Sequence, residues 1–180
     1  AWKQLFDSKG FEAAYGPTTV EQRCPDFKIS YEGHECQWNG PSWPYLTSMT
    51  LAAMANYFNS YDSPIITKKD YLSLLNIYSN SHRILSVNND TICWIDENIN
   101  PYTGDWISRT RLKSWKNGTW DDSKGGVERG KDYNHSSFCN LIISGLMGVR
   151  PQEDGSIIIN PLVPDGCWDY FCLDNVYCQG

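Results

Sequence analysis

Two adjacent carboxylates, Asp96 and Glu97, begin the stretch "DENINPYTGDW", the part of the sequence best suited to acid–base chemistry. Pro101 and Gly104 follow within a few residues and restrict the conformations of this segment. A glutamate held in that way can act as a general base and take a proton from water. We therefore expect Glu97 to be a catalytic base. The alternative is that Asp96 and Glu97 form a solvated turn.

Aromatic and amide side chains surround this glutamate in the sequence. Trp94 on one side and Tyr102 or Trp106 on the other can exclude water and stack on a ligand. Asn98 and Asn100 can form directional hydrogen bonds to hydroxyl groups. This combination of rings and amides is typical of a sugar site, and we predict that Tyr102 contacts the substrate.

A second group of candidates lies in "CQWNGPSWP", where two tryptophans flank an asparagine and a glycine. Indole rings pack well against the apolar face of a sugar, and a glycine lets the backbone approach a ligand closely. The helix that follows leaves backbone N–H groups that can donate to hydroxyl oxygens. We predict substrate contacts at Trp38, Asn39, Gly40 and Trp43. Alternatively, the tryptophans only anchor the start of the helix.

A third group lies in "ERGKDYNHSSF", where charged residues precede an apolar segment of helical character. Because the start of a buried helix often faces a cleft, we predict that Lys131 and Asp132 bracket sugar hydroxyls there; a solvated surface cluster is the alternative. His34, His82 and His135 lack the spacing of metal ligands, and nucleotide-binding motifs are absent. We expect no metal and no cofactor.

Bulk composition narrows the class of protein. A chain of 180 residues is long enough for one domain with a real core. Its formal charge of −6 repels phosphate backbones and anionic lipid, so we expect neither a nucleic acid nor a membrane partner. Aromatic residues make up 14% of the chain, which fits either a sugar-binding surface or a tryptophan-rich core.

The cysteines and glycosylation sequons bear on the cellular compartment. The chain has 7 cysteines, an odd number, and none forms a CxxC pair, so both secreted disulfides and buried thiols remain open. Sequons begin at Asn89, Asn117 and Asn134. Together these features slightly favour a secreted or lumenal protein.

Helical periodicity is clearest in the first half of the chain. The spacing of apolar residues predicts a helix from about Trp43 to Phe58, with Pro44 in its first turn. A second helix begins near Thr67, which with Asp70 resembles a capping box, and it should pair antiparallel with the first. The segment before these helices, residues 1–36, has no helical period and is expected to be rich in loops.

The second half combines irregular and regular segments. Residues 88–130 are expected to form a long irregular stretch around a possible short helix at 106–115. A third, well-buried helix follows, with Asn134 or Ser136 as its cap and Gly148 as its stop. Two short strands are predicted after it, one at Ile157–Ile159 and one in the aromatic tail. The predicted fold class is mainly α with a short β tail.

The three candidate segments, in their order and spacing, resemble the C-terminal part of six-hairpin glycosidases of the clan that contains glucosidase family 63 and mannosylglycerate hydrolase. The likeness spans most of residues 12–180. In that clan a segment of the form E-N-x-N-P-x-T-G carries the catalytic base, and Glu97 occupies the glutamate position. The clan's sugar subsite is lined by a tryptophan-bearing helix start, which corresponds to residues 38–43. His135 stands where related enzymes have an aromatic residue, and we include it among the substrate-binding candidates.

The resemblance also implies an (α/α)6 toroid and inverting hydrolysis of α-linked oligosaccharides or glycosides, which requires a general acid as well as a base. No segment in residues 1–36 resembles the one that carries the clan's acid, and Asp26 is a poor substitute. We therefore expect residues 1–149 to be the later hairpins of a toroid and residues 150–180 a short β tail. The acid, and the rest of the toroid, would come from an N-terminal part of the same enzyme or from another chain.

Two other classes of function remain open from the sequence. A carbohydrate-binding or scaffold module would keep the aromatic lining but not the catalysis. An unrelated helical interaction protein would bind no sugar.

Overall fold

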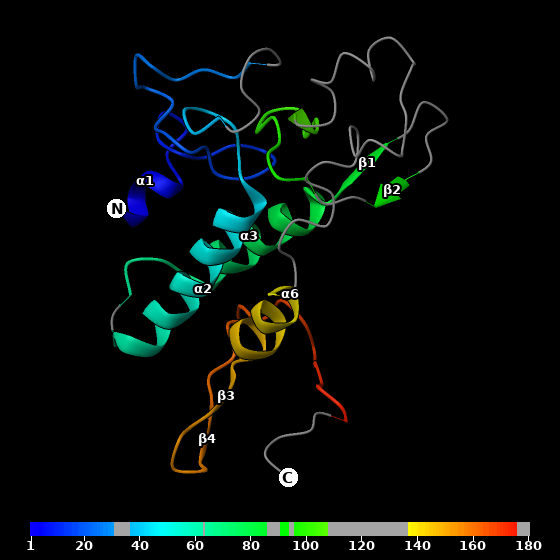
Figure 1. The fold of residues 1–180 in the computed structure, drawn as a ribbon. Helices are drawn as coiled ribbons and strands as arrows, with labels where there is room; N and C mark the ends of the chain where they lie inside the picture. The colour runs from blue at the N-terminus through cyan, green and yellow to red at the C-terminus, as the bar shows by residue number, and fades with distance from the viewer. Residues whose placement is uncertain (31–36, 63, 86–90, 94–95, 108–136, 176–180) are drawn as a thin grey trace. The chain divides into compact units, whose positions relative to one another are not determined.

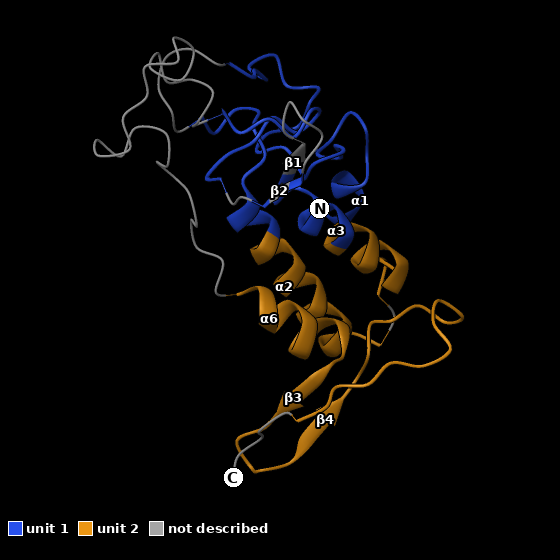
Figure 2. Cartoon of the chain, turned by 90° about the vertical axis from the view of Figure 1, so that its right-hand side faces the viewer, with its two compact units in different colours: residues 1–47, 76–135 blue, residues 48–75, 136–180 orange. Residues whose placement is uncertain are grey.

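The computed structural model describes residues 1–30, 37–62, 64–85, 91–93, 96–107 and 137–175 (Figure 1). The chain divides into two compact units (Figure 2). Unit 1 comprises residues 1–47 and 76–135, and unit 2 comprises residues 48–75 and 136–180. The described part is mainly helical with short two-stranded sheets, which confirms the predicted fold class and is consistent with a fragment of a helical toroid.

Helix α2 spans Pro44–Ser60 and confirms the first predicted helix. Its proline occupies the first turn, where a missing N–H costs no helical hydrogen bond. Leu51, Met54 and Ala55 on one side are buried, whereas Met49 on another side is 53% exposed. No helix in the described ranges is long and apolar enough to cross a membrane.

Helix α3 spans Lys68–Asn80 and confirms the second predicted helix. The capping box forms as expected: the Asp70 N–H donates to Thr67 Oγ1 over 3.2 Å, and the Thr67 N–H donates to Asp70 Oδ2 over 2.7 Å. The predicted apolar stripe is buried and consists of Tyr71, Leu74, Leu75 and Tyr78. Helices α2 and α3 run side by side in opposite directions, as predicted (Figures 1 and 2).

The third predicted helix is present, but it is not a regular α-helix. A short turn of α-helix, α6 (Phe138–Asn140), continues into the π-helix η2 (Leu141–Leu146). Leu141, Gly145 and Leu146 are buried, while α6 is exposed. Gly148 has a φ of 69° and ends the helix as predicted. The predicted caps, Asn134 and Ser136, lie outside the described residues.

Strands β3 (Val149–Pro151) and β4 (Ile157–Ile159) form an antiparallel hairpin with Val149 opposite Ile159. This result confirms the strand at Ile157–Ile159. The second strand, however, was predicted in the aromatic tail and lies instead directly after the third helix. From Asn160 through Asn175 the tail has no strand, and the partner of β4 is β3, across a short turn.

Two further elements were not predicted. Strands β1 (Arg83–Leu85) and β2 (Thr91–Cys93) form an antiparallel pair, and β2 lies within the stretch expected to be irregular. Helix α1 (Trp2–Leu5) is a single turn in the N-terminal segment. Three-residue strands and one-turn helices are too short to show a periodicity in the sequence. The possible helix at 106–115 lies almost entirely outside the described residues.

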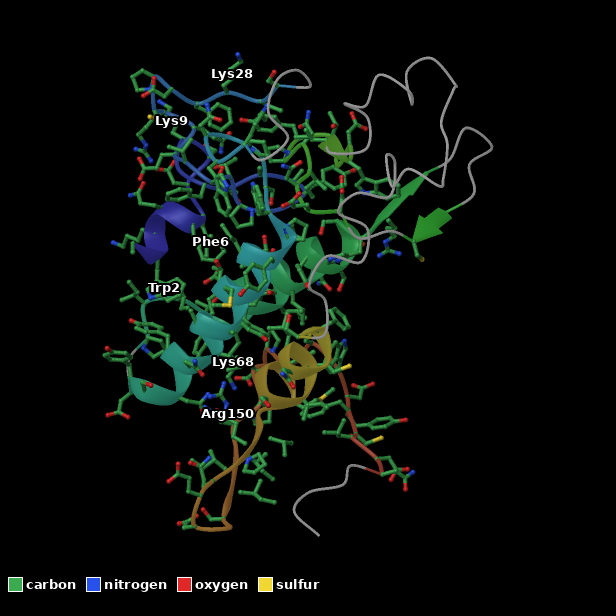
Figure 3. All side chains as sticks on the ribbon, in the orientation of Figure 1. Trp2, Phe6, Lys9, Lys28, Lys68 and Arg150 are labelled. Atoms are coloured by element: carbon green, nitrogen blue, oxygen red, sulfur yellow. The ribbon has the colours of Figure 1, made fainter. Side chains whose placement is uncertain are left out.

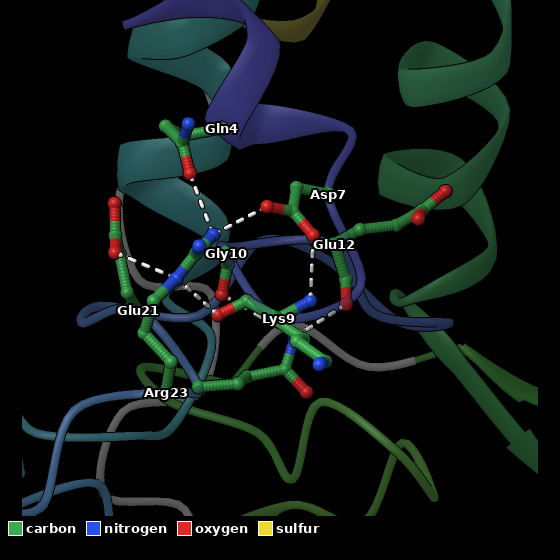
Figure 4. A network of polar contacts seen from close by, with 8 residues as sticks. Gln4, Asp7, Lys9, Gly10, Glu12, Glu21 and Arg23 are labelled. Carbon is green, nitrogen blue, oxygen red and sulfur yellow. Dashed lines mark hydrogen bonds and ion pairs between the residues drawn. The ribbon is translucent and has the colours of Figure 1, made fainter.

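The N-terminal loops are held together by polar contacts around one arginine (Figure 4). Arg23 Nε donates to the Lys9 carbonyl over 3.1 Å and lies 3.0 Å from Glu21 Oε2. Its Nη2 contacts the side chains of Gln4 and Asp7. The backbone N–H of Lys9, and then Arg23, lower the pKa of the Asp7 carboxyl. These contacts order a loop-rich segment that has little regular structure.

Candidate active site

The glutamate segment is the third member of a short ladder of antiparallel bridges in unit 1. Thr18 pairs with Ser42, Ser42 with Ile99, and Ile99 with Trp106. The Ser42 N–H donates to the Ile99 carbonyl over 3.0 Å, and the Ile99 N–H donates back over 2.9 Å. Ile99 and Trp106 are almost fully buried. Ile99, two residues after the candidate base, is therefore paired on one side with the distant Ser42 and on the other with the nearby Trp106.

The two adjacent carboxylates have different environments. Asp96 is 1% exposed, and its Oδ1 accepts the N–H of Glu97 over 3.0 Å. Glu97 itself is half-buried. Asp96 is therefore not a solvated turn residue, as the alternative interpretation required. It holds the backbone at Glu97, while the Glu97 side chain keeps access to solvent.

The turn that follows Glu97 is organised by Asn100. The Asn100 N–H donates to the Asp105 carbonyl over 2.8 Å, and the Gly104 N–H donates to the Asn100 carbonyl over 2.9 Å. The side-chain Oδ1 of Asn100 accepts the N–H groups of Tyr102 and Thr103 over 3.0 and 3.3 Å. This is the local hydrogen bonding that favours asparagine in turns. The side-chain oxygen predicted to bind hydroxyls thus has a structural role.

Tyr15, in the N-terminal segment, packs against this turn and forms a hydrogen bond to it. Gly104 has a φ of 75°, and a Cβ added there would lie 2.7 Å from ring carbons of Tyr15. The Tyr15 N–H donates to the Pro101 carbonyl over 2.9 Å, and its ring packs against Ile99 and Trp106. Tyr15 was not among the predicted site residues, because no local pattern in the sequence links it to a turn far along the chain.

The two tryptophans before α2 form a stacked pair with unequal exposure. Their ring centroids are 4.0 Å apart at an interplanar angle of 19°. Trp43 is 3% exposed, and its Nε1 donates to the Gln37 carbonyl over 2.8 Å, whereas Trp38 is 53% exposed. Trp43 therefore anchors the start of α2, and Trp38 presents an exposed indole supported by a buried one.

Asn39 and Gly40 make contacts within the chain itself. Asn39 Nδ2 donates to the Asp26 carbonyl over 3.1 Å, and the Gly40 N–H donates to Thr19 Oγ1 over the same distance. A Cβ at Gly40 would lie 2.1 Å from the Lys28 carbonyl oxygen. The close approach that requires glycine here is thus to the protein's own backbone. The substrate contacts of both residues stay a prediction.

Tyr102 is 48% exposed and is held by a second residue that the sequence analysis missed. Its Oη donates to Gln22 Oε1 over 2.5 Å, and Gln22 Nε2 donates to the Glu12 carbonyl over 2.7 Å. Since the Gln22 amide nitrogen is bound to a carbonyl, its oxygen must accept, and Tyr102 must donate. Burial raises the pKa of Tyr102. Toward any ligand, this hydroxyl can only accept.

Lys131, Asp132 and His135 lie outside the described residues, as does Trp94, and their roles stay predictions. Across the described ranges, no group of three or more His, Cys, Asp or Glu residues could hold a metal ion. The described cysteines are free thiols, and they are Cys24, Cys93, Cys139, Cys167 and Cys172.

A hollow of about 610 Å³ opens beside the turn in unit 1. That volume falls within the range of small-molecule sites. Polar and aromatic side chains line it together, a mixture that suits hydroxyl-rich ligands. The lining residues are Ala14, Tyr15, Asn80, Arg83, Thr91, Thr103, Gly104 and Asp105. Glu97 is not among them, so the hollow lies on the Gly104 side of the motif.

Comparison with known proteins identifies the kind of domain. Residues 1–136 match the family described as "Mannosylglycerate hydrolase MGH1-like glycoside hydrolase domain". A solved structure described as "Sialidase" is similar, with a TM-score of 0.72 and 36% sequence identity. The alignment covers 94% of this chain but only 14% of that chain. Among curated proteins, none matches.

Proposed function

Because the chain belongs to the mannosylglycerate hydrolase MGH1-like glycoside hydrolase family, we propose that it is part of an inverting catalytic domain with Glu97 as the general base. The observation that carries this proposal is the different burial of two neighbouring acidic residues. Asp96 is buried and accepts the Glu97 N–H over 3.0 Å, and Glu97 is half-buried. A base needs a fixed backbone and a side chain that can meet water.

In the proposed reaction, Glu97 removes a proton from a water molecule that attacks the anomeric carbon of the sugar. A general acid on the opposite face protonates the leaving oxygen. Inverting enzymes separate the two carboxyl groups by roughly 6.5–9.5 Å, which leaves room for that water. We place the acid outside this chain.

The proposed substrate is an α-linked oligosaccharide or glycoside. Trp38 supplies an exposed indole face, backed by Trp43 at 4.0 Å, on which a pyranose ring can stack. Tyr102 accepts a hydrogen bond from a sugar hydroxyl, because its own proton is donated to Gln22. Lys131, Asp132 and His135 are proposed to contact further hydroxyls.

The proposed partner is the rest of a toroid. The chain spans 14% of the sialidase chain that it resembles. We propose that an N-terminal part of the same enzyme, or another chain, supplies the remaining hairpins together with the acid. The boundary between residues 1–149 and 150–180 remains part of this proposal.

The test is a Glu97→Gln substitution in an enzyme that includes the complete toroid. Loss of a general base should lower kcat about 10²–10⁴-fold while sugar binding persists. Glu153→Gln, at an exposed turn in unit 2, is the matched control and should leave kcat unchanged. NMR of the first-formed product should show an inverted anomeric configuration. Full activity in the Glu97→Gln enzyme would refute the assignment.

The same experiment separates the enzyme from a carbohydrate-binding module. A module would show no hydrolysis in any variant but would lose sugar binding on Trp38→Ala, because the exposed indole is removed. An interaction protein without a sugar site would bind no sugar in any form.

A further inference from the structure

Unit 2 contains a second hollow, of about 350 Å³, which the proposed hydrolysis does not use. Helices α2 and α3, the π-helix η2 and strand β3 all contribute to its wall. Its lining residues are Ala52, Ala55, Asn56, Tyr71, Asn140, Leu141, Ser144, Gly145, Arg150, Pro151 and Gln152. Arg150 is the cation among them, and Figure 3 labels it on β3.

The groups in the described ranges that bind the Arg150 side chain are neutral. Its Nε donates to the Ser144 carbonyl over 3.0 Å, and its Nη1 donates to Asn56 Oδ1 over 3.0 Å. Within the described part of the chain, Arg150 forms no ion pair, and its Nη2 makes no hydrogen bond. The side chain is half-buried, and this burial lowers the pKa of the guanidinium. A partly desolvated cation favours an anionic partner.

The wall around Arg150 is rigid. Tyr71 is fully buried, and its Oη donates to the Leu141 carbonyl over 2.9 Å. A Cβ at Gly145 would lie 2.0 Å from that Oη, so the π-helix packs directly on the tyrosine. Gln152 Nε2 donates to the Arg150 carbonyl over 2.9 Å. Because hydrogen bonds hold Nε and Nη1 of Arg150 in place, its Nη2 is already positioned to bind a ligand.

We propose that this hollow binds a small organic carboxylate, which pairs with the Arg150 guanidinium while its carbon chain packs on Ala52, Ala55 and Leu141. A guanidinium matches the planar geometry of a carboxylate. Arg150 is the single cation among the described lining residues, and the wall exposes more apolar than polar surface. This combination favours a monoanion with an apolar part over a multiply charged phosphate. This site lies in unit 2 and does not depend on Glu97, so either proposal can fail alone.

The experiment titrates the enzyme that includes the complete toroid with hexanoate and follows its backbone amides by NMR. Saturable shifts are expected near Ser144 and Arg150, and 1-hexanol at equal concentration should cause none. Inorganic phosphate should bind at least about tenfold more weakly than hexanoate, since it lacks the apolar part. Equal shifts with hexanol, stronger binding of phosphate, or no saturable shift with hexanoate would each overturn the proposal.

Two variants and one control locate the site. Arg150→Met should weaken hexanoate binding at least about tenfold through loss of the charged hydrogen bond. Because Arg150 also joins Asn56 to Ser144, this variant can unfold, so Ala52→Leu provides an independent test: it fills the hollow and leaves the arginine in place. Ala53→Leu, on the same helix but outside the lining, should bind normally. Unchanged binding in Ala52→Leu would contradict the assignment.

Discussion

Two turns in the molecule contain a glycine in nearly the same backbone conformation but in very different surroundings. Gly104, beside the candidate base in unit 1, has a φ of 75°, and Gly155, between β3 and β4 in unit 2, has a φ of 82°. A Cβ at Gly104 would meet the ring of Tyr15 at 2.7 Å, whereas a Cβ at Gly155 would meet nothing within 4 Å.

The difference shows which turn depends on the rest of the fold. Among the described residues, the Gly155 turn is held by local hydrogen bonds, such as the Ser156 N–H to Asp154 Oδ1 over 2.9 Å. The Gly104 turn is held by a tyrosine from a distant segment and by the buried Ile99 and Trp106. A turn that positions a catalytic group gains from such tertiary support, because its geometry must persist during binding.

The largest expected effect comes from adding one methyl group to each glycine. Gly104→Ala combines positive φ with steric overlap and should lower the free energy of unfolding by about 2–4 kcal/mol. Gly155→Ala meets open space and should cost only about 1–2 kcal/mol. Urea unfolding of both variants measures the difference. Equal losses would show that backbone conformation alone explains both glycines.

The next effect compares a buried tyrosine in each unit under alkaline conditions. Burial raises the pKa of Tyr71 in unit 2 and of Tyr78 in unit 1 to about 12, from a model-compound value of 10.0. Above pH 10 the unfolded chain loses these protons and the folded chain keeps them, so stability falls as pH rises from about 10 to 12. For each tyrosine, a pKa shift of this size corresponds to roughly 3 kcal/mol.

Phenylalanine variants measure this alkaline loss. Tyr71→Phe and Tyr78→Phe should each flatten the decline of unfolding free energy between pH 10 and 12. Tyr71→Phe also removes the hydrogen bond to Leu141, which should cost about 1 kcal/mol at neutral pH. A decline of unchanged slope in both variants would assign the alkaline transition to other groups.

A double-mutant cycle sharpens the comparison of the two glycines. If the Tyr15 ring is what excludes a Cβ at Gly104, then Gly104→Ala in a Tyr15→Ala background should cost no more than Gly155→Ala. The expected coupling energy is about 1–2 kcal/mol. Chemical denaturation of the four proteins provides it, and zero coupling would contradict the role assigned to Tyr15.

The smallest effect concerns one exposed carboxylate in each unit. The hydroxyl and then the N–H of Ser156 lower the pKa of Asp154, and the Lys9 N–H and then Arg23 lower that of Asp7. Both contributions to stability are present above the ordinary aspartate pKa of 3.8 and are lost as pH falls through the lowered pKa of the folded state. Asp7→Asn and Asp154→Asn should each make acid unfolding slightly less steep. A steeper acid transition in either variant would contradict the prediction that the carboxylate stabilises the folded state.

The regular elements and the candidate base follow from local patterns in the sequence. The Thr67–Asp70 capping box and the apolar stripe of α3 are visible because their residues lie within a few turns of one another. The glutamate before a proline and glycine turn is visible for the same reason. Local patterns did not predict the π-helix. In the structure Gly145 of this helix packs on Tyr71, which lies on another helix and far away in the sequence.

The candidate site was only partly predictable. The sequence pointed to Trp38 and Trp43 as equivalent, yet one ring is exposed and the other buried. The sequence also suggested that Gly40 lets a ligand approach the backbone closely. In the structure, the group that lies close to Gly40 is the Lys28 carbonyl. Gln22, which holds the Tyr102 hydroxyl, carries no motif of its own.

By itself, the sequence determined where helices α2 and α3 begin, that the third helix ends at Gly148, and which glutamate stands before a constrained turn. Each of these depends on residues that are close together in the chain. Only the tertiary structure decided that Asp96 is buried beside a half-exposed Glu97, and that Tyr15 closes the turn. Those outcomes depend on contacts between segments far apart in the chain, as between Tyr15 and Gly104, and burial is a property of the whole packed unit.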